Sequence, residues 1–404
     1  MTSVSIPSRP VDRLVQLKNH LSTMTQKQHK LCMIPGPVEF HEDVLEAMST
    51  PATSHVDPNF IPVFGEVIEM TRKVVLSQAA QPIILSGSGT LGWDQMCNVI
   101  EEGDEVIVTN TGYFGDRFGE CLETYGAHVT AIRVPVGHRV TVEKVKEAFE
   151  SIKKPVKMIT MTHVDTSTGV LGDVKGIAAY VRQHSPETLI VIDAVCAVAS
   201  EELRFDEWDI DVVISATQKA LGAPPGLSVV VASQRAIKVY ENRKTPVRNY
   251  YSNWGKWLPI MAAYEARKPA YFATPAVQLI YAFHVSLSQI LAYGIENRFA
   301  AHREASVQFR MALAHLGLKP VAVDETCAAN GMTAVWYPEG VDAKLVAQMA
   351  GQGVQIAGGL LQPHAPNYFR IGHMGLSVCD PNRKHIKKVI DVLTASLSQL
   401  GYKA

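Results

Sequence analysis

A single lysine follows a strand-like run in the middle of the chain and precedes a loop rich in proline and glycine, in the stretch SATQKALGAPPG at 215–226. The run IDVVIS at 210–215 has the composition of a buried parallel strand, whereas other lysines stand in polar helical stretches such as RKHIKKVIDVL. Lys219 is therefore predicted at the carboxyl edge of a sheet, where open α/β folds bind their ligands. A partly desolvated amine there loses its proton easily and can act as a nucleophile toward an aldehyde.

Two more polar features come after predicted strands. Asp193 ends the apolar run LIVID, where an isolated carboxylate is costly unless it is paired or hydrogen-bonded. The loop GSGTLG at 87–92 offers a phosphate its backbone N–H groups and the hydroxyls of Ser88 and Thr90. A phosphate loop, a strand-end aspartate and a strand-end lysine are together what pyridoxal 5′-phosphate needs from a protein.

The same loop matches GxGxxG, the pattern of a dinucleotide-binding Rossmann unit. Such a unit has an acidic residue at the end of the next strand to hold the ribose, but VIVTNT ends in Thr109, Asn110 and Thr111. A long segment also precedes this supposed first unit of the fold. The loop is therefore interpreted as a phosphate site without an adenosine site.

The elements that position these residues alternate in type from residue 82 onward. The runs PIILS, DEVIVTN, HVTAIRV, VKMITMTH, TLIVIDAV and DVVISAT are separated by amphipathic patterns such as TVEKVKEAFESI and VKGIAAYVRQH. This rhythm predicts an α/β fold with a mostly parallel sheet covered by helices. After the lysine loop, GLSVVVAS indicates one more strand.

The pattern changes beyond about residue 275. A long helical region is followed by MTAVWYP, DAKLVAQMAGQ and YFRIGHM and by a last helix, RKHIKKVIDVLTASLSQL, which together predict a smaller α+β domain. We therefore expect an amino-terminal arm at 1–31, a large cofactor-binding domain at 32–285 and a small domain at 286–404.

Composition excludes several classes of function. The chain has 404 residues, of which 47% are hydrophobic and 19% charged, and its net charge is −1. No basic block indicates nucleic acid or an anionic membrane as a partner, and no apolar stretch reaches the roughly 18 residues of a membrane span. The six cysteines show neither CxxC nor zinc-ligand spacing, so we expect no metal site and a reducing compartment.

The amino end leaves two interpretations open. Residues 1–30 carry five Lys or Arg against one acid, Asp12, with several Ser and Thr, a composition typical of a mitochondrial presequence. The alternative is a polar arm that packs on a neighbouring subunit. The terminal GYKA does not match a peroxisomal Ser-Lys-Leu signal, so the expected location is the cytoplasm or the mitochondrial matrix.

Six separated motifs make the chain similar to a known family. SGSGT, GYFGDR, DTSTGVL, VIDAV, SATQKALGAPPG and YFRIGHMG, in this order, resemble the class V aminotransferases of fold type I, and most closely the alanine–glyoxylate aminotransferases. The likeness runs from about residue 32 to near the carboxyl terminus. It implies a seven-stranded type of sheet, pyridoxal 5′-phosphate as cofactor, and ping-pong transfer of the amino group of L-alanine to glyoxylate, which gives pyruvate and glycine.

The resemblance also implies roles for single residues. Lys219 would bond to the cofactor and carry the proton, Asp193 would pair with the pyridine nitrogen, and Arg370 would bind the substrate carboxylate with two parallel hydrogen bonds. Gly36 of IPGPV would help to narrow the space beside the substrate side chain. The implied cofactor-binding residues are Ser88, Gly89, Thr90, Phe114, Thr166, Gln218 and, from the other subunit of a homodimer, Tyr271 and Thr274.

Two of these positions depart from the common family pattern. Phe114 stands where many members have tryptophan, so a ring stacked on the cofactor would have less contact area. Thr166 stands where relatives often have serine. We expect the scattered histidines His163, His364 and His373 to be structural.

Other activities share most of this pattern. A serine–glyoxylate or a phosphonate-linked aminotransferase of class V has nearly the same motifs, and nothing in their spacing distinguishes alanine from serine as the donor. A cysteine desulfurase is disfavoured, because the stretch 351–370 has no cysteine and Gln218 stands where those enzymes commonly have histidine. A non-catalytic protein that binds the cofactor would leave the whole set of residues idle.

Overall fold

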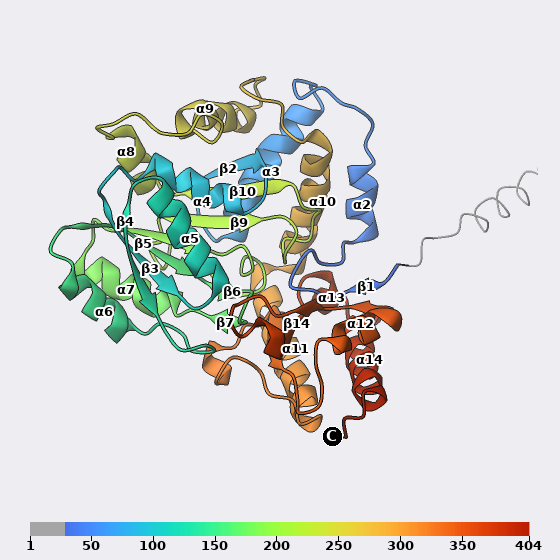
Figure 1. The fold of residues 1–404 in the computed structure, drawn as a ribbon. Coiled ribbons are helices and arrows are strands. Elements are labelled where there is room, and N and C mark those ends of the chain that lie inside the picture. The colour runs from blue at the N-terminus through green and yellow to red at the C-terminus, as the bar shows by residue number, and fades with distance from the viewer. Residues whose placement is uncertain (1–28, 404) are drawn as a thin grey trace, which may run out of the picture.

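The computed structural model describes residues 29–403. They form a larger and a smaller α/β part, which two long helices connect (Figure 1). Most of the predicted arm or targeting segment at 1–31 lies outside the described residues. Among residues 29–403, no helix combines the length and the apolar character needed to cross a bilayer. No group of three or more His, Cys, Asp or Glu in this part is placed to hold a metal ion.

Seven strands form the central sheet, in the order β2-β10-β9-β8-β5-β3-β4. Strands β9, β8, β5, β3 and β4 pair in parallel, whereas β10 is antiparallel to both β9 and β2. The mostly parallel sheet is thus confirmed, and the antiparallel direction of β10 is an addition. The strands are β2 Gln81–Ser86, β3 Glu105–Asn110, β4 His128–Arg133, β5 Val156–Thr162, β8 Leu189–Asp193, β9 Val212–Ala216 and β10 Leu227–Ala232.

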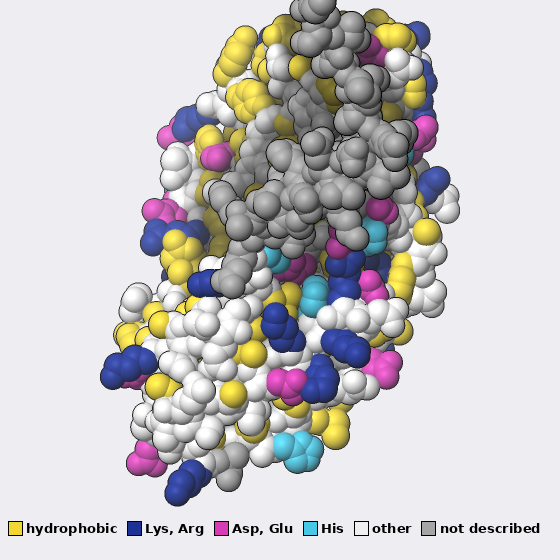
Figure 2. Space-filling model, turned by 90° about the vertical axis from the view of Figure 1, so that its right-hand side faces the viewer, with side chains coloured by type: hydrophobic (Ala, Val, Ile, Leu, Met, Phe, Trp, Pro, Cys, Tyr) yellow, Lys and Arg dark blue, Asp and Glu magenta, His cyan; other side chains and the backbone are white. Residues whose placement is uncertain are grey.

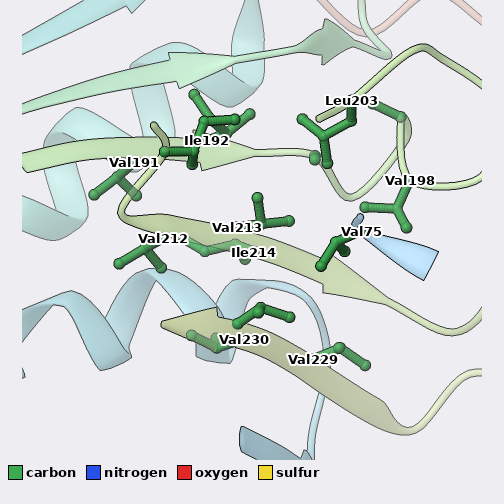
Figure 3. Close-up of a cluster of buried hydrophobic side chains, with 14 of the residues drawn as sticks. Val75, Val191, Ile192, Val198, Leu203, Val212, Val213, Ile214, Val229 and Val230 are labelled. Atoms are coloured by element: carbon green, nitrogen blue, oxygen red, sulfur yellow. The ribbon is translucent and has the colours of Figure 1, made fainter. Parts of the chain in front are cut away.

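The inner strands are apolar along their whole length because helices cover both faces of a parallel sheet. Every residue of β8 and of β9 is buried. Figure 3 shows how branched side chains of β8, β9 and β10, among them Val191, Val213 and Val230, lie beside one another, with Val198 and Leu203 nearby. β-Branched residues fit this pleated, buried surface well.

Helices pack on this sheet and on one another. Helix α5 contacts β3 and β4, α7 contacts β8, α3 and α9 contact β2, and α10 packs along α2 and α3. Side-chain caps start several of them: Thr141 caps α6, Asp173 caps α7 and Ser233 caps α8. The helices are α2 Glu42–Met48, α3 Phe60–Val74, α4 Thr90–Asp94, α5 Tyr113–Thr124, α6 Val142–Ser151, α7 Val174–His184, α8 Gln234–Glu241, α9 Trp254–Glu265 and α10 Val277–Tyr293.

The carboxyl-terminal part builds a second core around a three-stranded antiparallel sheet in the order β11-β14-β13. Its elements are α11 Ile295–His315, β11 Met332–Trp336, α12 Lys344–Gly351, β12 Val354–Gln355, β13 Ala357–Gly358, β14 Tyr368–Gly372, α13 Leu376–Cys379 and α14 His385–Gln399. Strand β1, Leu31–Cys32, pairs in parallel with β12 and so ties the start of the described chain to this part. The predicted boundary at 285/286 falls inside α10 and stays a prediction.

The visible surface around α14 carries mixed charge. Figure 2 shows Lys and Arg side chains interspersed with Asp, Glu and His there. One ion pair, between Arg383 and Glu42, joins the small part to α2. A mixed surface of this kind agrees with a net charge near zero.

Candidate active site

Lys219 lies in the loop that follows β9, at the carboxyl edge of the sheet. Its ammonium donates a hydrogen bond to the carbonyl of Pro35, in the segment that comes from β1. Burial lowers the pKa of Lys219, and the nearby charge of Arg370 lowers it further, although the Cys196 thiol and Asp193 oppose the shift. The amine is therefore easier to deprotonate than an exposed lysine, as a nucleophile requires.

Gly36 packs directly on this lysine. A Cβ at Gly36 would lie 2.3 Å from Cδ and 2.8 Å from Nζ of Lys219, and the φ angle of +88° also favours glycine. No larger residue fits at this position without displacing the lysine side chain. Gly36 and Lys219, predicted to share a site, are thus neighbours.

Asp193 is 4% exposed and ends β8, the strand next to β9. Its Oδ2 accepts a hydrogen bond of 2.9 Å from the indole Nε1 of Trp93, and its Oδ1 accepts one of 3.1 Å from the backbone N–H of Val195. Burial raises the pKa of Asp193 to about 6, and the hydrogen bonds and Lys219 limit the increase. Trp93 is a contact that the sequence did not suggest, because it comes from α4, about a hundred residues upstream.

The glycine loop lies beside the loop that follows Asp193. A Cβ at Gly89 would come within 2.8 Å of Cγ2 of Val195, so glycine permits this close approach. Helix α4 starts at Thr90; the N–H groups of Leu91 and Gly92 donate to the carbonyls of Ser88 and Gly89, at 3.0 and 2.8 Å, so the N–H groups that precede them are the ones open to a ligand. Ser88 and Thr90 are exposed. The loop can therefore present hydroxyls and N–H groups to a phosphate.

Gln218 directly precedes Lys219, and only some of its polar atoms have hydrogen-bond partners. Its side-chain Oε1 is buried without a hydrogen-bond partner among the described residues. Its backbone carbonyl accepts from the N–H of Val38, 3.1 Å away. An orphaned amide oxygen beside Lys219 is a polar atom that a bound ligand would satisfy.

Phe114 lies in the first turn of α5, and its ring meets that of Trp93 edge to face, with 6.4 Å between ring centroids. Its position is set by Asp165, a residue that sequence reasoning missed. The buried carboxylate of Asp165 accepts from the N–H groups of Phe114 at 3.1 Å and Gly115 at 3.3 Å. It also accepts from the N–H and hydroxyl of Ser167, at 2.9 and 2.6 Å. The short polar run DTST was the signal that could have identified it, since such residues form local side-chain bonds.

Arg370 lies on β14, the central strand of the small sheet, and reaches back to the large part. Its Nε donates to the carbonyl of Gly358 at 2.7 Å and its Nη1 to the carbonyl of Thr166 at 3.1 Å. The backbone of Thr166, rather than its hydroxyl, makes this contact. No carboxylate in residues 29–403 forms an ion pair with Arg370, and burial lowers its pKa. A partly buried guanidinium without a counter-ion is suited to bind an anionic ligand.

Tyr271 and Thr274 lie outside this cluster. Both are exposed in the segment before α10, and Tyr271 is 63% exposed. The Tyr271 ring packs on His55, with 4.9 Å between centroids. Neither residue hydrogen-bonds to Lys219, Asp193 or Gln218 in the described chain. Their role in the site of a partner subunit therefore stays a prediction.

The three histidines that we expected to be structural each pack against, or hydrogen-bond to, neighbouring residues. His163 is buried, which lowers its pKa to about 4, and its backbone N–H donates to the carbonyl of Asp193 at 2.9 Å. His373 is buried beside the hydroxyl of Thr333, 2.8 Å from its Nε2. His364 packs edge to face on Trp336.

Comparison with known proteins adds family information to this geometry. A family model described as aminotransferase class-V matches residues 47–362. The chain is 40% identical to alanine–glyoxylate aminotransferase 1 of Saccharomyces cerevisiae, over 91% of this chain and 97% of that protein. It is 31% identical to L-aspartate–glyoxylate aminotransferase of Paracoccus denitrificans, over 85% of each.

A solved structure is similar over nearly the whole chain. The structure of alanine–glyoxylate aminotransferase from Nostoc sp. matches with a TM-score of 0.85 and 27% identity, and the match covers 97% of this chain and 100% of that one.

Proposed function

Because the chain belongs to the class V aminotransferases, we propose that it transfers the amino group of L-alanine to glyoxylate and so forms pyruvate and glycine, with pyridoxal 5′-phosphate as cofactor. The two curated relatives both carry glyoxylate in their names but differ in the amino donor. Glyoxylate as acceptor is therefore supported by both, and alanine as donor by the more similar one.

The observation that carries the proposal is the pair formed by Arg370 and Lys219. The guanidinium of Arg370, which has no carboxylate partner among residues 29–403, lies close enough to the lysine amine to lower the pKa of Lys219. An α-amino acid has a carboxylate and an amino-bearing carbon one bond apart, and these two groups match such a pair. The guanidinium fork fixes the carboxylate, and the α-carbon then faces the amine.

The residues around Lys219 fit the cofactor. Gly89 allows the glycine loop to pack closely against the loop after Asp193, and the Oε1 of Gln218, which has no hydrogen-bond partner among the described residues, would supply a polar contact. When bound, pyridoxal phosphate supplies an aldehyde that accepts the amino group and a ring that withdraws electrons from the α-carbon.

The protein's own groups direct this chemistry. The Nζ of Lys219 takes the proton from the substrate α-carbon, which its lowered pKa favours. The carboxylate of Asp193, held by Trp93, would pair with the ring nitrogen of the cofactor and keep it protonated. Because donor and acceptor use one site in turn, Arg370 binds the carboxylates of both.

The segment around Gly36 favours small substrates. The carbonyl of Pro35 accepts from Lys219, and Gly36 touches the lysine side chain. Because this segment packs so closely against the amine of Lys219, little room is left beside the α-carbon of a bound substrate. Alanine, serine and glyoxylate have side groups small enough for this space.

Half-reactions with single substrates test the proposal. L-Alanine, L-serine and L-aspartate are added separately to the purified holoenzyme, and the visible cofactor band and the released keto acid are followed. We expect alanine to bleach the band and yield pyruvate, after which glyoxylate restores the band and forms glycine. Bleaching by serine or aspartate alone would replace the donor, and no bleaching by any of them would overturn the substrate assignment.

A further inference from the structure

Two side chains of β14 hydrogen-bond to the same neighbouring loop. Tyr368 and Arg370 are two positions apart on the strand and therefore project from the same face. The Tyr368 hydroxyl donates to the carbonyl of Ser167 at 2.6 Å, and Nη1 of Arg370 donates to the carbonyl of Thr166 at 3.1 Å. Consecutive carbonyls of the large part thus receive the tyrosine and the arginine.

The same two side chains also hold the segment 358–361, which leads out of β13. The carbonyl of Gly358 accepts from Nε of Arg370 at 2.7 Å. The N–H groups of Leu360 and Leu361 both donate to the Tyr368 hydroxyl, each at 2.9 Å. This hydroxyl therefore donates one hydrogen bond and accepts two, which is its full capacity.

The segment also packs against the tyrosine ring. Tyr368 is 1% exposed. A Cβ at Gly359 would lie 2.8 Å from Cε1 of Tyr368 and 2.3 Å from the carbonyl oxygen of Ala365. Glycine is thus required where the chain passes the ring, and the hydroxyl fixes the chain just beyond that point.

We propose that Tyr368 is a positioning residue that sets the substrate-binding geometry of Arg370 by anchoring the segment 358–361 to the loop at 166–167. The inference rests on the proposed function in one respect, namely that Arg370 binds the substrate carboxylate. Without the hydroxyl, two N–H groups and one carbonyl lose their partner. The segment then shifts, and Gly358 no longer holds Nε of the guanidinium.

Replacement of the tyrosine by phenylalanine isolates the hydroxyl. Tyr368→Phe keeps the ring that packs on Gly359 and removes only the three hydrogen bonds. In the holoenzyme we expect KM for the amino donor and for glyoxylate each to rise about tenfold, with kcat changed by less than about threefold, because binding of the carboxylate is weakened throughout the reaction. The half-reaction with L-alaninamide, which lacks the carboxylate, should change little.

Tyr337→Phe is a matched control. Tyr337 follows β11, the strand paired with β14, and its ring packs on Phe369 with 5.3 Å between centroids. Its buried hydroxyl has no hydrogen-bond partner among the described residues. Loss of this hydroxyl should leave both KM values unchanged.

Amide hydrogen exchange gives a readout that does not depend on catalysis. In the wild-type holoenzyme, the N–H groups of Leu360 and Leu361 should exchange far more slowly than that of the exposed Gln362. Tyr368→Phe should remove this protection, and Tyr337→Phe should preserve it. Rapid exchange at Leu360 and Leu361 in the wild type would overturn the proposal without any variant.

The other possible results of these experiments separate the role of Tyr368 from the proposed function. Unchanged KM values in Tyr368→Phe, or raised KM values with full amide protection, would contradict the proposal, because the effect has to run through the segment 358–361. A wild-type enzyme that uses none of the tested donors would instead refute the proposed function, and the exchange experiment would still decide whether Tyr368 anchors this segment.

Discussion

Burial shifts the pKa values of the three ionisable residues at the centre of the candidate site. The pKa of Lys219 is lowered, that of Asp193 is raised to about 6, and that of Arg370 is lowered, each chiefly because the charged form is removed from water. In the proposed reaction the lower pKa of the lysine is favourable, since its amine would have to lose a proton. The raised pKa of the aspartate is unfavourable, since its carboxylate would have to stay charged, and the Trp93 hydrogen bond opposes this shift.

Removal of the indole donor should therefore change the pH dependence of the reaction. In Trp93→Phe the carboxylate of Asp193 loses a bond that favours its charged form, so its pKa rises. Because the proposed mechanism uses ionised Asp193, the acidic limb of the pH–rate profile of the alanine half-reaction should move to higher pH.

Trp254→Phe is the control for this change. Trp254 is also buried and donates its indole N–H, at 3.1 Å, to Oε1 of Gln95 rather than to Asp193. This variant should lose stability and keep the wild-type pH profile. An acidic limb that stays in place in Trp93→Phe would show that the indole does not tune Asp193.

At the scale of elements, strand ends were the most predictable part of the site. The runs LIVID and IDVVIS correspond to β8 and β9; Asp193 is the last residue of β8, and Lys219 follows the carboxyl end of β9, as expected. Strands that are apolar along their whole length indicate a parallel sheet, and parallel strands bring their carboxyl ends to the same edge of the sheet. The positions of Asp193 and Lys219 therefore followed from local sequence.

Contacts between distant elements could not be predicted in this way. Asp165 holds the start of α5, about fifty residues upstream. Arg370 and Tyr368 meet carbonyls of a loop about two hundred residues away. These bonds depend on how the small sheet docks on the large one, and neither propensity nor periodicity carries that information. The antiparallel direction of β10 was missed for the same reason.

The bond between Asp165 and α5 predicts a defined loss. Asp165→Asn replaces one carboxylate oxygen with an amide that cannot accept from Phe114 or Gly115, so the first turn of α5 should loosen. We expect a loss of about 1–3 kcal/mol in the free energy of unfolding and about tenfold weaker cofactor binding through Phe114. Denaturant unfolding and cofactor titration measure the two effects.

Asp173→Asn serves as the comparison. Asp173 caps α7 by accepting from the N–H of Gly176 at 3.0 Å, and asparagine is about as good a cap as aspartate. Cofactor affinity should not change in this variant. Equal cofactor affinity in Asp165→Asn and the wild type would mean that the cap does not position Phe114.

For the whole molecule, the two cores are joined by polar links, and Glu201 is a buried carboxylate among them. This carboxylate, 1% exposed, follows β8 and accepts from the backbone N–H and side-chain Nδ2 of Asn330, both at 2.6 Å, and from the N–H of Gly331 at 3.1 Å. Burial raises the pKa of Glu201 from 4.5 to about 7. Its charge therefore costs stability near neutral pH.

The sign of the pH effect follows from linkage. A folded-state pKa above the unfolded one gives a contribution that is fully present below about pH 4.5 and is lost as the pH rises through about 7. The melting temperature should thus fall between about pH 5 and pH 8, and Glu201→Gln should flatten this decrease. The neighbouring Glu202→Gln, at a more exposed carboxylate, should keep the wild-type slope. A slope that is the same in all three proteins would remove Glu201 as the cause.

Tyr271 and Thr274 belong to the scale of the assembly, because they are exposed in one chain and predicted to complete the phosphate site of another. If sites are shared in this way, a dimer of one Lys219→Ala chain and one Tyr271→Ala chain carries both defects in one site and none in the other. Mixing the two weakly active proteins under subunit exchange should then restore activity, up to about a quarter of the wild-type value when chains pair at random in a two-fold dimer. If each site is built from a single chain, every site in the mixture carries one defect, and the activity stays at the average of the two variants.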